Sequence, residues 1–390
     1  MGLVCRISQQ SVGLSLALAL AIAGCGSDPG NADSVDAGNI DIDADPVAGD
    51  VDAGIDATVT DDEAWDEVRA YFDDHDVADM TLLIGDDTGT LLVHEKGGST
   101  SNTEYRIASA TKWVTAAVIM RLVEDGTLSL SDHPQDYLDY WTDDAEDVRS
   151  QVTLDQLLSF TSGFRGRPGW VPCVSDGDST LAACAETVYG YLHDYDPGTT
   201  FHYGPAHMHT AARMAEVATG KSWQEIVVDE LAAPLGFADD VSWALASEGH
   251  PMPSGGLRTS AAFYARFLQA VASGEILADS RENMATPRTV DATIGYTPID
   301  ANTLGAWTYA LGQWRECSGT QWTAACDERE VSSSPGAFGF YPWYDRSNGY
   351  WAIIAVELAL DQNPPQITVP LGLDLQPMIE AVFAARRQLH

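Results

Sequence analysis

Hydrophobic residues recur at two different spacings in the stretch that follows residue 62. Trp65, Val68 and Phe72 lie three and four residues apart, which predicts one face of an amphipathic helix. Residues 80–86 and 89–98 are two short apolar runs that meet at the sequence Asp-Asp-Thr-Gly, a hairpin signal. This part of the chain is therefore expected to form a helix followed by two paired strands.

Longer hydrophobic segments follow along the chain. Residues 109–124 are apolar on most sides, so we expect a buried central helix there. A Gly-Pro pair that ends at Pro205 opens another helix, with proline in its first turn, and Gly220 closes it. Near the C-terminus, residues 348–360 predict a buried strand and residues 375–390 predict an amphipathic last helix.

The order of these segments predicts the fold class. A helix, strands, a long and mostly helical middle, then strands and a final helix are typical of an α/β fold, here an α+β sandwich. We expect an antiparallel sheet, split between the two ends of the chain and flanked by helices, with a mostly helical second lobe. A chain of 390 residues could hold one large domain or two smaller ones. We place one domain at residues 62–390.

Residues 1–24 have the features of an export signal. A single Arg6 precedes an apolar run at residues 12–23, which is too short to span a bilayer comfortably. Alanine and glycine stand directly before Cys25, and this order resembles a bacterial lipobox, after which the cysteine is lipidated. We therefore expect an exported lipoprotein of the bacterial cell envelope, bound to a lipid bilayer through Cys25, with no other membrane-spanning segment. The alternative is a plain secretory signal that contains this cysteine.

Acidic residues dominate the next segment and mark the chain as a whole. Residues 26–62 contain eleven aspartates and no lysine or arginine, so residues 25–61 are expected to form a disordered, solvated tether. A calcium loop is the alternative for residues 41–46, but the glycine and the distant glutamate of an EF-hand are missing. The formal net charge of −38 repels phosphate backbones, so we expect no nucleic acid partner.

The six cysteines fall into three groups. Cys5 leaves with the signal and Cys25 takes the lipid. An even number remains in an exported chain, which suggests two disulfides among Cys173, Cys184, Cys317 and Cys326. Pairing neighbours in the sequence gives Cys173–Cys184 and Cys317–Cys326, although four cysteines allow three connectivities. A metal site is the alternative, but the chain has no Cys-x-x-Cys.

Ser109 and Lys112 lie three residues apart at the start of the expected central helix, so their side chains share one face. A serine hydroxyl is a weak nucleophile and needs a base within hydrogen-bond reach. Burial against an apolar helix lowers the pKa of a lysine, so that Lys112 can accept a proton. The helix N-terminus favours negative charge that develops nearby. Ser-x-x-Lys is a short pattern, however, and by itself it is only suggestive.

The surrounding sequence is more specific. Residues 105–130 resemble the nucleophile helix of the serine β-lactamase and penicillin-binding-protein family, which includes class C β-lactamases, DD-peptidases and β-lactamase-fold esterases. Stretches that are similar to further parts of the family follow in the right order, at residues 152–164, 196–237, 254–271, 309–314 and 334–358. The resemblance covers roughly residues 62–390 and implies the β-lactamase/DD-peptidase-like fold.

The resemblance also implies roles for individual residues. Ser109 would be the acylated nucleophile, Lys112 its general base, and Tyr203 the second-motif tyrosine that passes a proton to the leaving group. The backbone N–H groups of Ser109 and Ala337 would form the oxyanion hole. A core aromatic is the alternative for Tyr203, although its place after the sequence Pro-Gly-Thr-Thr-Phe-His favours the catalytic role.

Two departures from the family pattern bear on the substrate. The second motif, usually Tyr-x-Asn or Tyr-x-Ser, ends here in Pro205, which has no side-chain donor for an amide of the acyl group. The third motif, usually Lys-Thr-Gly or His-x-Gly, is here Ser334-Pro335-Gly336, without the cation that helps to hold a substrate carboxylate. Pro335 also lacks an N–H, which suggests an edge strand beside an open cleft.

These departures favour an ester or a neutral acyl compound as the substrate of an exported serine hydrolase. The alternatives are a β-lactamase or DD-carboxypeptidase that acts on cell-wall peptides, and a catalytically inactive binding module on the cell surface. All of these hypotheses rest on the same resemblance. The residues of the chemical core are present, whereas those that recognise an anionic amide are missing.

Other residues permit weaker hypotheses. His202, His207 and His209 are close in sequence, but the last two point to opposite sides of a helix, so packing is favoured over zinc and we expect no metal or cofactor. An α/β-hydrolase triad lacks its Gly-x-Ser-x-Gly anchor. Arg165 and Arg167 could supply the missing positive charge from a loop. Tryptophans and tyrosines are plentiful and could line an apolar acyl or sugar cleft, although most are expected in the core.

Overall fold

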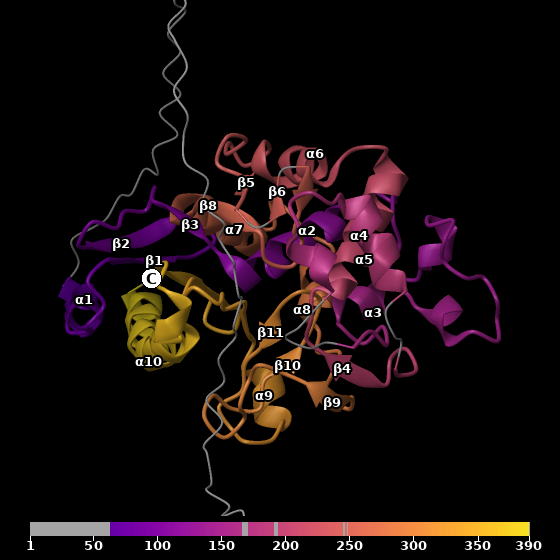
Figure 1. Ribbon diagram of the computed structural model, residues 1–390. Coiled ribbons are helices and arrows are strands. Elements are labelled where there is room, and N and C mark those ends of the chain that lie inside the picture. The colour runs from indigo at the N-terminus through magenta and orange to yellow at the C-terminus, as the bar shows by residue number, and fades with distance from the viewer. Residues whose placement is uncertain (1–62, 166–170, 191–193, 245, 248, 390) are drawn as a thin grey trace, which may run out of the picture. The chain divides into compact units, whose positions relative to one another are not determined.

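The computed structural model describes residues 63–389 apart from 166–170, 191–193, 245 and 248 (Figure 1). The chain divides into two units, Met1–Gly54 and Ile55–His390, and all described residues belong to the second. The predicted export signal, the lipidation site Cys25 and the acidic tether lie outside the described residues, so they stay predictions.

A seven-stranded sheet is the largest sheet of the described chain, and every pairing in it is antiparallel. The strand order β10-β11-β12-β13-β14-β1-β2 places two N-terminal strands beside five C-terminal ones, which confirms the predicted split sheet. Its strands are β1 (Met80–Gly85), β2 (Thr90–Lys96), β10 (Thr308–Tyr309), β11 (Trp314–Arg315), β12 (Val331–Ser333), β13 (Tyr341–Asp345) and β14 (Tyr350–Ala355). The predicted hairpin is the pair β1 and β2, and the predicted C-terminal strand is β14.

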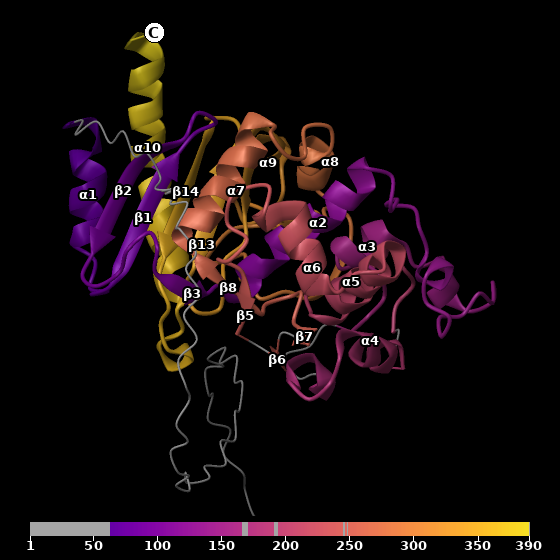
Figure 2. The same cartoon turned by 90° about the horizontal axis from the view of Figure 1, so that it is seen from above.

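Helices cover both faces of this sheet. Helix α7 (Ala261–Ser273) contacts β1 and β14, and α10 (Pro365–Leu389) contacts β13 and β14 from the opposite side (Figures 1 and 2). Helix α1 (Asp66–Asp73) packs against α10. The side chains of Val68 and Phe72 on α1 are buried, which confirms the predicted amphipathic helix.

The middle of the chain forms the predicted, mostly helical lobe. Its core is α2 (Thr111–Glu124), in which eleven of fourteen residues are buried and which packs against α5 (Ala206–Thr219). The remaining α-helices of the described chain are α3 (Leu154–Leu158), α4 (Leu181–Tyr189), α6 (Trp223–Val227), α8 (Arg281–Ala285) and α9 (Ala324–Glu328). Short strands complete the described chain: β3 (Glu104–Arg106), β4 (Thr200–His202), β5 (Ser242–Trp243), β6 (Ala246–Ser247), β7 (His250–Pro251), β8 (Leu257–Ser260) and β9 (Thr293–Tyr296).

The last helix is longer than its hydrophobic pattern predicts. Helix α10 begins at Pro365 rather than near residue 375, and it contains Pro370 and Pro377. Packing overrides the low helix propensity of this segment: a Cβ on Gly372 would lie only 2.3 Å from the ring of Tyr341. By length and composition, 23 residues of α10 could cross a membrane, contrary to our expectation that no later segment could; half of an apolar window of 18 residues within it is buried inside the protein.

Both predicted disulfide pairings are confirmed. Cys173 is bonded to Cys184 at the start of α4, with their Cα atoms 5.4 Å apart. Cys317 is bonded to Cys326 on α9, with a Cα separation of 5.2 Å. The bridged cysteines are 11 and 9 residues apart in the sequence, so each bridge restricts local rather than long-range freedom of the unfolded chain.

Candidate active site

Ser109 lies in the 3₁₀ turn Ala108–Ala110 that leads into α2. The residue before it, Ala108, has a φ of +45°, a left-handed conformation that is strained for alanine. Flanking hydrogen bonds hold the turn: the Ile107 N–H donates to Leu257 O at 3.1 Å, and the Tyr264 hydroxyl donates to Ala110 O at 3.0 Å. The serine is thereby fixed at the N-terminal end of a buried helix, where developing negative charge is favoured.

Lys112 lies one turn further along, with its Nζ 3.1 Å from the Ser109 Oγ. The amine also donates a hydrogen bond to the carbonyl oxygen of Ser254. Only 4% of the Lys112 surface is exposed, and this burial lowers the pKa of the amine from 10.5 to about 7. A substantial fraction of Lys112 is therefore uncharged at neutral pH and can act as a base.

Tyr203 approaches the same serine from the end of β4. Its hydroxyl shares a hydrogen bond with the Ser109 side chain, and its ring centroid lies 4.7 Å from the Lys112 Nζ. The ring also stacks against Trp314 at 5.4 Å between centroids. Burial raises the pKa of the Tyr203 phenol, and the hydrogen bond to Ser109 opposes this rise only in part. Tyr203 therefore keeps its proton, which leaves Lys112 as the base and makes the phenol a proton relay.

The residues after Tyr203 connect the second motif to its neighbours. Pro205 is the N-cap residue of α5, which confirms the predicted helix start, and Gly220 ends the helix with a φ of +70°. The His207 Nε2–H donates to His202 O at 2.9 Å, so its Nδ1 accepts the hydroxyl proton of Ser162 at 2.8 Å. These contacts of His207 join the predicted Thr-Ser-Gly turn at residues 161–163 to the second-motif segment.

The third motif lies directly against the backbone of the nucleophile turn. The Ser334 hydroxyl is buried and donates to Ser109 O at 2.9 Å. A Cβ on Gly336 would come within 2.2 Å of Ile107 O, so no larger residue fits there without a shift of the backbone. Ala337, the predicted second oxyanion donor, follows this close contact.

The prediction of an edge strand at Pro335 is wrong. Pro335 follows β12, and β12 pairs with β11 on one side and β13 on the other, so it is an internal strand. The proline is tolerated because it stands beyond the last paired residue, Ser333, where its missing N–H removes no bond of the ladder.

Comparison with protein-family models gives a match over most of the chain. The model of the family described as Beta-lactamase matches residues 65–357. The chain belongs to the β-lactamase family. The predicted resemblance is thus confirmed, and with it the β-lactamase/penicillin-binding-protein fold.

Individual relatives of this β-lactamase family member carry different activities in their names. Penicillin-binding protein 4 of Amycolatopsis lactamdurans is 31% identical over 138 residues, which are 35% of this chain and 36% of that protein. Lovastatin esterase of Penicillium rubens is 28% identical over 178 residues, 41% of this chain and 44% of the esterase. The chain therefore spans less than half the length of these two curated relatives.

A solved structure gives a more extensive match. A candidate β-lactamase from Bacteroides dorei superposes with a TM-score of 0.66 at 26% identity. The superposition covers 82% of this chain and 98% of the other. The family fold therefore extends over most of the chain, and the family match at residues 65–357 includes Ser109, Lys112 and Tyr203.

Sequence reasoning missed one part of the site and misjudged another. It did not identify the carbonyl of Ser254 as a partner of Lys112; the available signal was the Ser-Gly-Gly sequence at this position, which marks a close backbone approach. Arg165, which could have replaced the missing third-motif cation, instead forms an ion pair with Asp194. Arg167 lies outside the described residues.

The aromatic residues expected to be core are largely buried. Trp314 is 3% exposed and Trp307 is 9% exposed, and their ring centroids lie 6.4 Å apart. Through Trp314 this cluster supports the ring of Tyr203 rather than forming an open sugar platform. Its contribution to the site is therefore the position of the tyrosine.

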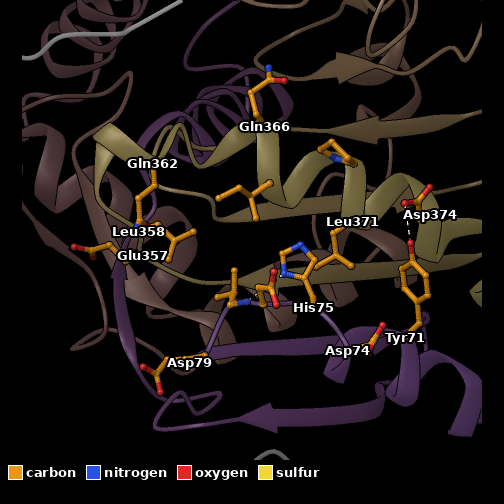
Figure 3. A pocket seen from close by; sticks show the side chains of 15 residues that line it. Tyr71, Asp74, His75, Asp79, Glu357, Leu358, Gln362, Gln366, Leu371 and Asp374 are labelled. Atoms are coloured by element: carbon orange, nitrogen blue, oxygen red, sulfur yellow. Dashed lines mark hydrogen bonds between the residues drawn. The ribbon is translucent and has the colours of Figure 1, made fainter.

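A separate hollow of about 880 Å³ lies between the end of α1 and the first turns of α10 (Figure 3). Asp74, Asp79 and Asp374 are on its wall, and the Tyr71 hydroxyl donates to Asp374 at 2.8 Å. The residues that line it do not include Ser109, Lys112 or Tyr203. It is therefore distinct from the candidate active site, and the acidic wall would disfavour an anionic ligand.

Proposed function

We propose that this protein is a serine hydrolase that cleaves an ester or a neutral acyl compound through an acyl-enzyme on Ser109. The observation that carries the proposal is the contact of 3.1 Å between the Ser109 Oγ and the Nζ of a buried lysine. A surface lysine would hold its proton at neutral pH, whereas Lys112 has a pKa of about 7 and can release it. Membership of the β-lactamase family supports the same chemistry.

Acylation follows from this arrangement. The Ser109 Oγ forms a bond to the acyl carbonyl carbon while its proton passes to the Lys112 Nζ. The resulting oxyanion would be stabilised by the backbone N–H groups of Ser109 and Ala337. When the bond between carbonyl carbon and leaving oxygen breaks, the proton reaches the leaving oxygen through the Tyr203 hydroxyl, which already shares a hydrogen bond with Ser109.

Deacylation uses the same groups in reverse. Lys112, again uncharged after the leaving group has taken the proton, accepts a proton from a water molecule through the Tyr203 hydroxyl. The water oxygen attacks the acyl carbon, the bond to the Ser109 Oγ breaks, and the proton returns to the serine. The acid product leaves and the enzyme is restored, so no cofactor takes part in this sequence.

Two features support an ester or a neutral acyl group over an anionic amide. Pro205 offers no side-chain hydrogen bond at the second motif, and its carbonyl is engaged by His209. The Ser334 hydroxyl at the third motif is engaged with Ser109 O, and no cation stands in that motif to pair with a substrate carboxylate. The similarity to a lovastatin esterase points the same way.

A comparison of substrates tests this proposal. Purified protein is assayed with short-chain p-nitrophenyl esters, with nitrocefin and with a D-Ala-D-Ala peptide, and each rate is compared with that of Ser109→Ala. We expect the esters to have the highest kcat/KM. In the Ser109→Ala variant, kcat/KM for the esters should fall by at least about 10³-fold. Faster turnover of nitrocefin or of the peptide would contradict the proposed substrate class but leave the nucleophile intact.

A β-lactamase or DD-carboxypeptidase activity is the second candidate. The observation in its favour is the 31% identity to a penicillin-binding protein, which is higher than the identity to the esterase. If the peptide or nitrocefin is the better substrate, this candidate replaces the first. If no compound is turned over by folded protein, the third hypothesis, a binding module without catalysis, gains support.

We also propose that the enzyme is an exported lipoprotein, held to a bilayer of the cell envelope through Cys25. The support is the sequence alone: an apolar run of a dozen residues, small residues before the cysteine, and a long acidic tether behind it. The disulfides fit an exported protein, since such bonds persist in oxidising compartments.

A further inference from the structure

Three potential metal ligands that are not part of the candidate active site lie close together. The Sγ of Cys184 and a ring nitrogen each of His209 and His250 lie within 4.8 Å of one another. They come from α4, α5 and β7, which are far apart in the sequence, so no short motif reveals them. All three residues are fully buried, and the two imidazole centroids are 5.9 Å apart.

Backbone contacts determine which ring nitrogens remain available to bind an ion. The Nδ1 of His209 is 3.1 Å from Pro205 O, and the Nδ1 of His250 is 2.7 Å from Asp176 O. A carbonyl oxygen only accepts hydrogen bonds, so both Nδ1 atoms carry a proton, and in the neutral ring each Nε2 carries a lone pair. Neither Nε2 has a hydrogen-bond partner among the described residues.

This is the arrangement of metal-binding histidines, in which one ring nitrogen donates to a carbonyl and the other binds the ion. Two buried ring nitrogens without hydrogen-bond partners in the described chain are costly in the absence of a ligand, since buried polar atoms otherwise find partners. We propose that Cys184, His209 and His250 form a site for a zinc-like divalent ion when the disulfide to Cys173 is open, with Cys173 as the fourth ligand. Two thiolates and two imidazoles are a common tetrahedral zinc set.

The ion and the disulfide exclude each other in this proposal, because only a thiolate is a strong ligand. A dithiol reductant transfers two electrons and two protons to the Cys173–Cys184 bond, which opens to two thiols while the reductant becomes a disulfide. The ion then replaces both thiol protons, which are released to water. Chain that has not yet formed the bond reaches the same dithiol state without a reductant.

The site differs from the zinc hypothesis that the sequence suggested. His207 is engaged on both ring nitrogens, with Ser162 and with His202 O, and so it offers no lone pair. His209 instead turns toward Cys184 and His250. The cross-link would join α5, which follows Tyr203, to β7, which leads to the Ser254 carbonyl that binds Lys112. The proposal does not depend on the hydrolase activity.

Cobalt binding tests the proposal on the whole chain. A variant with Cys317→Ser and Cys326→Ser removes the other cysteine pair of the folded domain and serves as the parent. This parent is reduced with a phosphine in the absence of oxygen and is then titrated with Co²⁺. We expect one equivalent to bind with a thiolate-to-cobalt charge-transfer band and tetrahedral ligand-field bands, and Zn²⁺ to displace it. The oxidised parent should show neither band.

Histidine variants identify the ligands. His209→Ala and His250→Ala should each weaken Co²⁺ binding at least about tenfold. His133→Ala is the matched control, because the His133 Nδ1 also lies 2.8 Å from a backbone carbonyl but outside the cluster; it should change nothing. Absence of stoichiometric binding to the reduced parent would overturn the proposal and leave a bridging water as the occupant. An unchanged affinity for Co²⁺ in both histidine variants would overturn the proposal as well. If the two variants do not fold, the Co²⁺ titration of the reduced parent decides.

Discussion

Lys112 has to satisfy two conditions that conflict in water. It must be close enough to Ser109 to take a proton, and it must not already hold one. The buried face of α2 meets both, because it places the amine 3.1 Å from the hydroxyl and withholds the water that would stabilise its charge. The Ser254 carbonyl then orients the amine.

The pKa of Lys112 predicts how activity depends on pH. The base must be uncharged, and burial lowers its pKa to about 7, so kcat/KM should rise as pH increases through about 7 and level off above it. A lysine in water would give this rise near its ordinary 10.5 instead. The measurement is kcat/KM for a p-nitrophenyl ester from about pH 5 to about pH 9, where such a single acid limb is resolved. An activity that is flat across this range would contradict the assignment of Lys112 as the base.

Tyr203→Phe isolates the phenolic hydroxyl from the ring. The stacking on Trp314 remains, so the protein should fold normally, but the relay to the leaving group is lost. We expect kcat for an ester to fall by roughly 10²–10⁴-fold. Tyr309→Phe is the matched control, since Tyr309 is a buried neighbour in the same aromatic cluster, 5.9 Å from Tyr203 between ring centroids. Equal effects of the two substitutions would show that the hydroxyl of Tyr203 has no special role.

At this scale the sequence predicts the catalytic residues but not the residues that contact them. Ser109 and Lys112 are three residues apart on one helix, so local geometry alone predicts that they meet. Tyr203 required the family resemblance, because nothing local places residue 203 beside residue 109. Contacts such as Ser254 O with Lys112, or His209 with His250, depend on how distant segments pack, and no spacing in the sequence encodes them.

At the scale of elements, the site is an arrangement of four ends. The 3₁₀ turn and the first turn of α2 provide the serine and the lysine, the end of β4 provides the tyrosine, and the turn after β12 carries the third motif. The segment before β8 completes it with the Ser254 carbonyl. Each group lies near the beginning or the end of a helix or strand. Regular structure therefore positions the group, while its polar atoms are not used in the backbone hydrogen bonds of sheets and helices.

Gly336→Ala tests the close approach of the third-motif turn to the nucleophile turn. A Cβ at this position would lie 2.2 Å from Ile107 O, so one of the two turns must move. A displacement of catalytic groups by about 1 Å lowers the reaction rate roughly 10²-fold, and we expect a fall in kcat/KM of that order. The control is Gly190→Ala, where the nearest contact of a new Cβ is 3.4 Å away and the φ is negative. Full activity of Gly336→Ala would contradict this role of the turn.

Elements were predictable where one periodicity dominated. The β1–β2 hairpin, α2 and the start of α5 at Pro205 follow from apolar spacing and from turn residues. The first ten residues of α10 did not, because proline and glycine disfavour a helix locally while the sheet surface stabilises it. The internal place of β12 could not be predicted either, since strand order is set by pairings over long separations.

At the scale of the whole molecule, the acidic net charge and the predicted lipidation at Cys25 bear on where the enzyme acts and on which substrates can approach it. The eleven aspartates of residues 26–62 account for less than a third of the net charge of −38, so the folded domain is acidic as well. Such a surface keeps a protein soluble and repels anionic ligands. A neutral ester is the kind of substrate that this field does not exclude.

Cys25→Ala tests the proposed anchor. In a bacterial host, the protein without the substitution should incorporate a fatty-acid probe and sediment with the membranes, because the lipid on Cys25 attaches it to the bilayer. The variant should lose the label and appear in the soluble fraction, with unchanged kcat/KM for esters, since the site residues all lie in the folded domain. Membrane association and labelling that survive the substitution would contradict lipidation at Cys25.

The central claim is that Ser109 is an activated nucleophile, and covalent labelling tests it most directly. Purified protein is treated with a fluorophosphonate probe, and the adduct is measured by intact mass and located by peptide mapping. We predict one adduct, on Ser109, that is absent in Ser109→Ala and in Lys112→Ala. Folded protein that forms no adduct, or one on another serine, would contradict the account and make Pro205 and Ser334 signs of a lost activity.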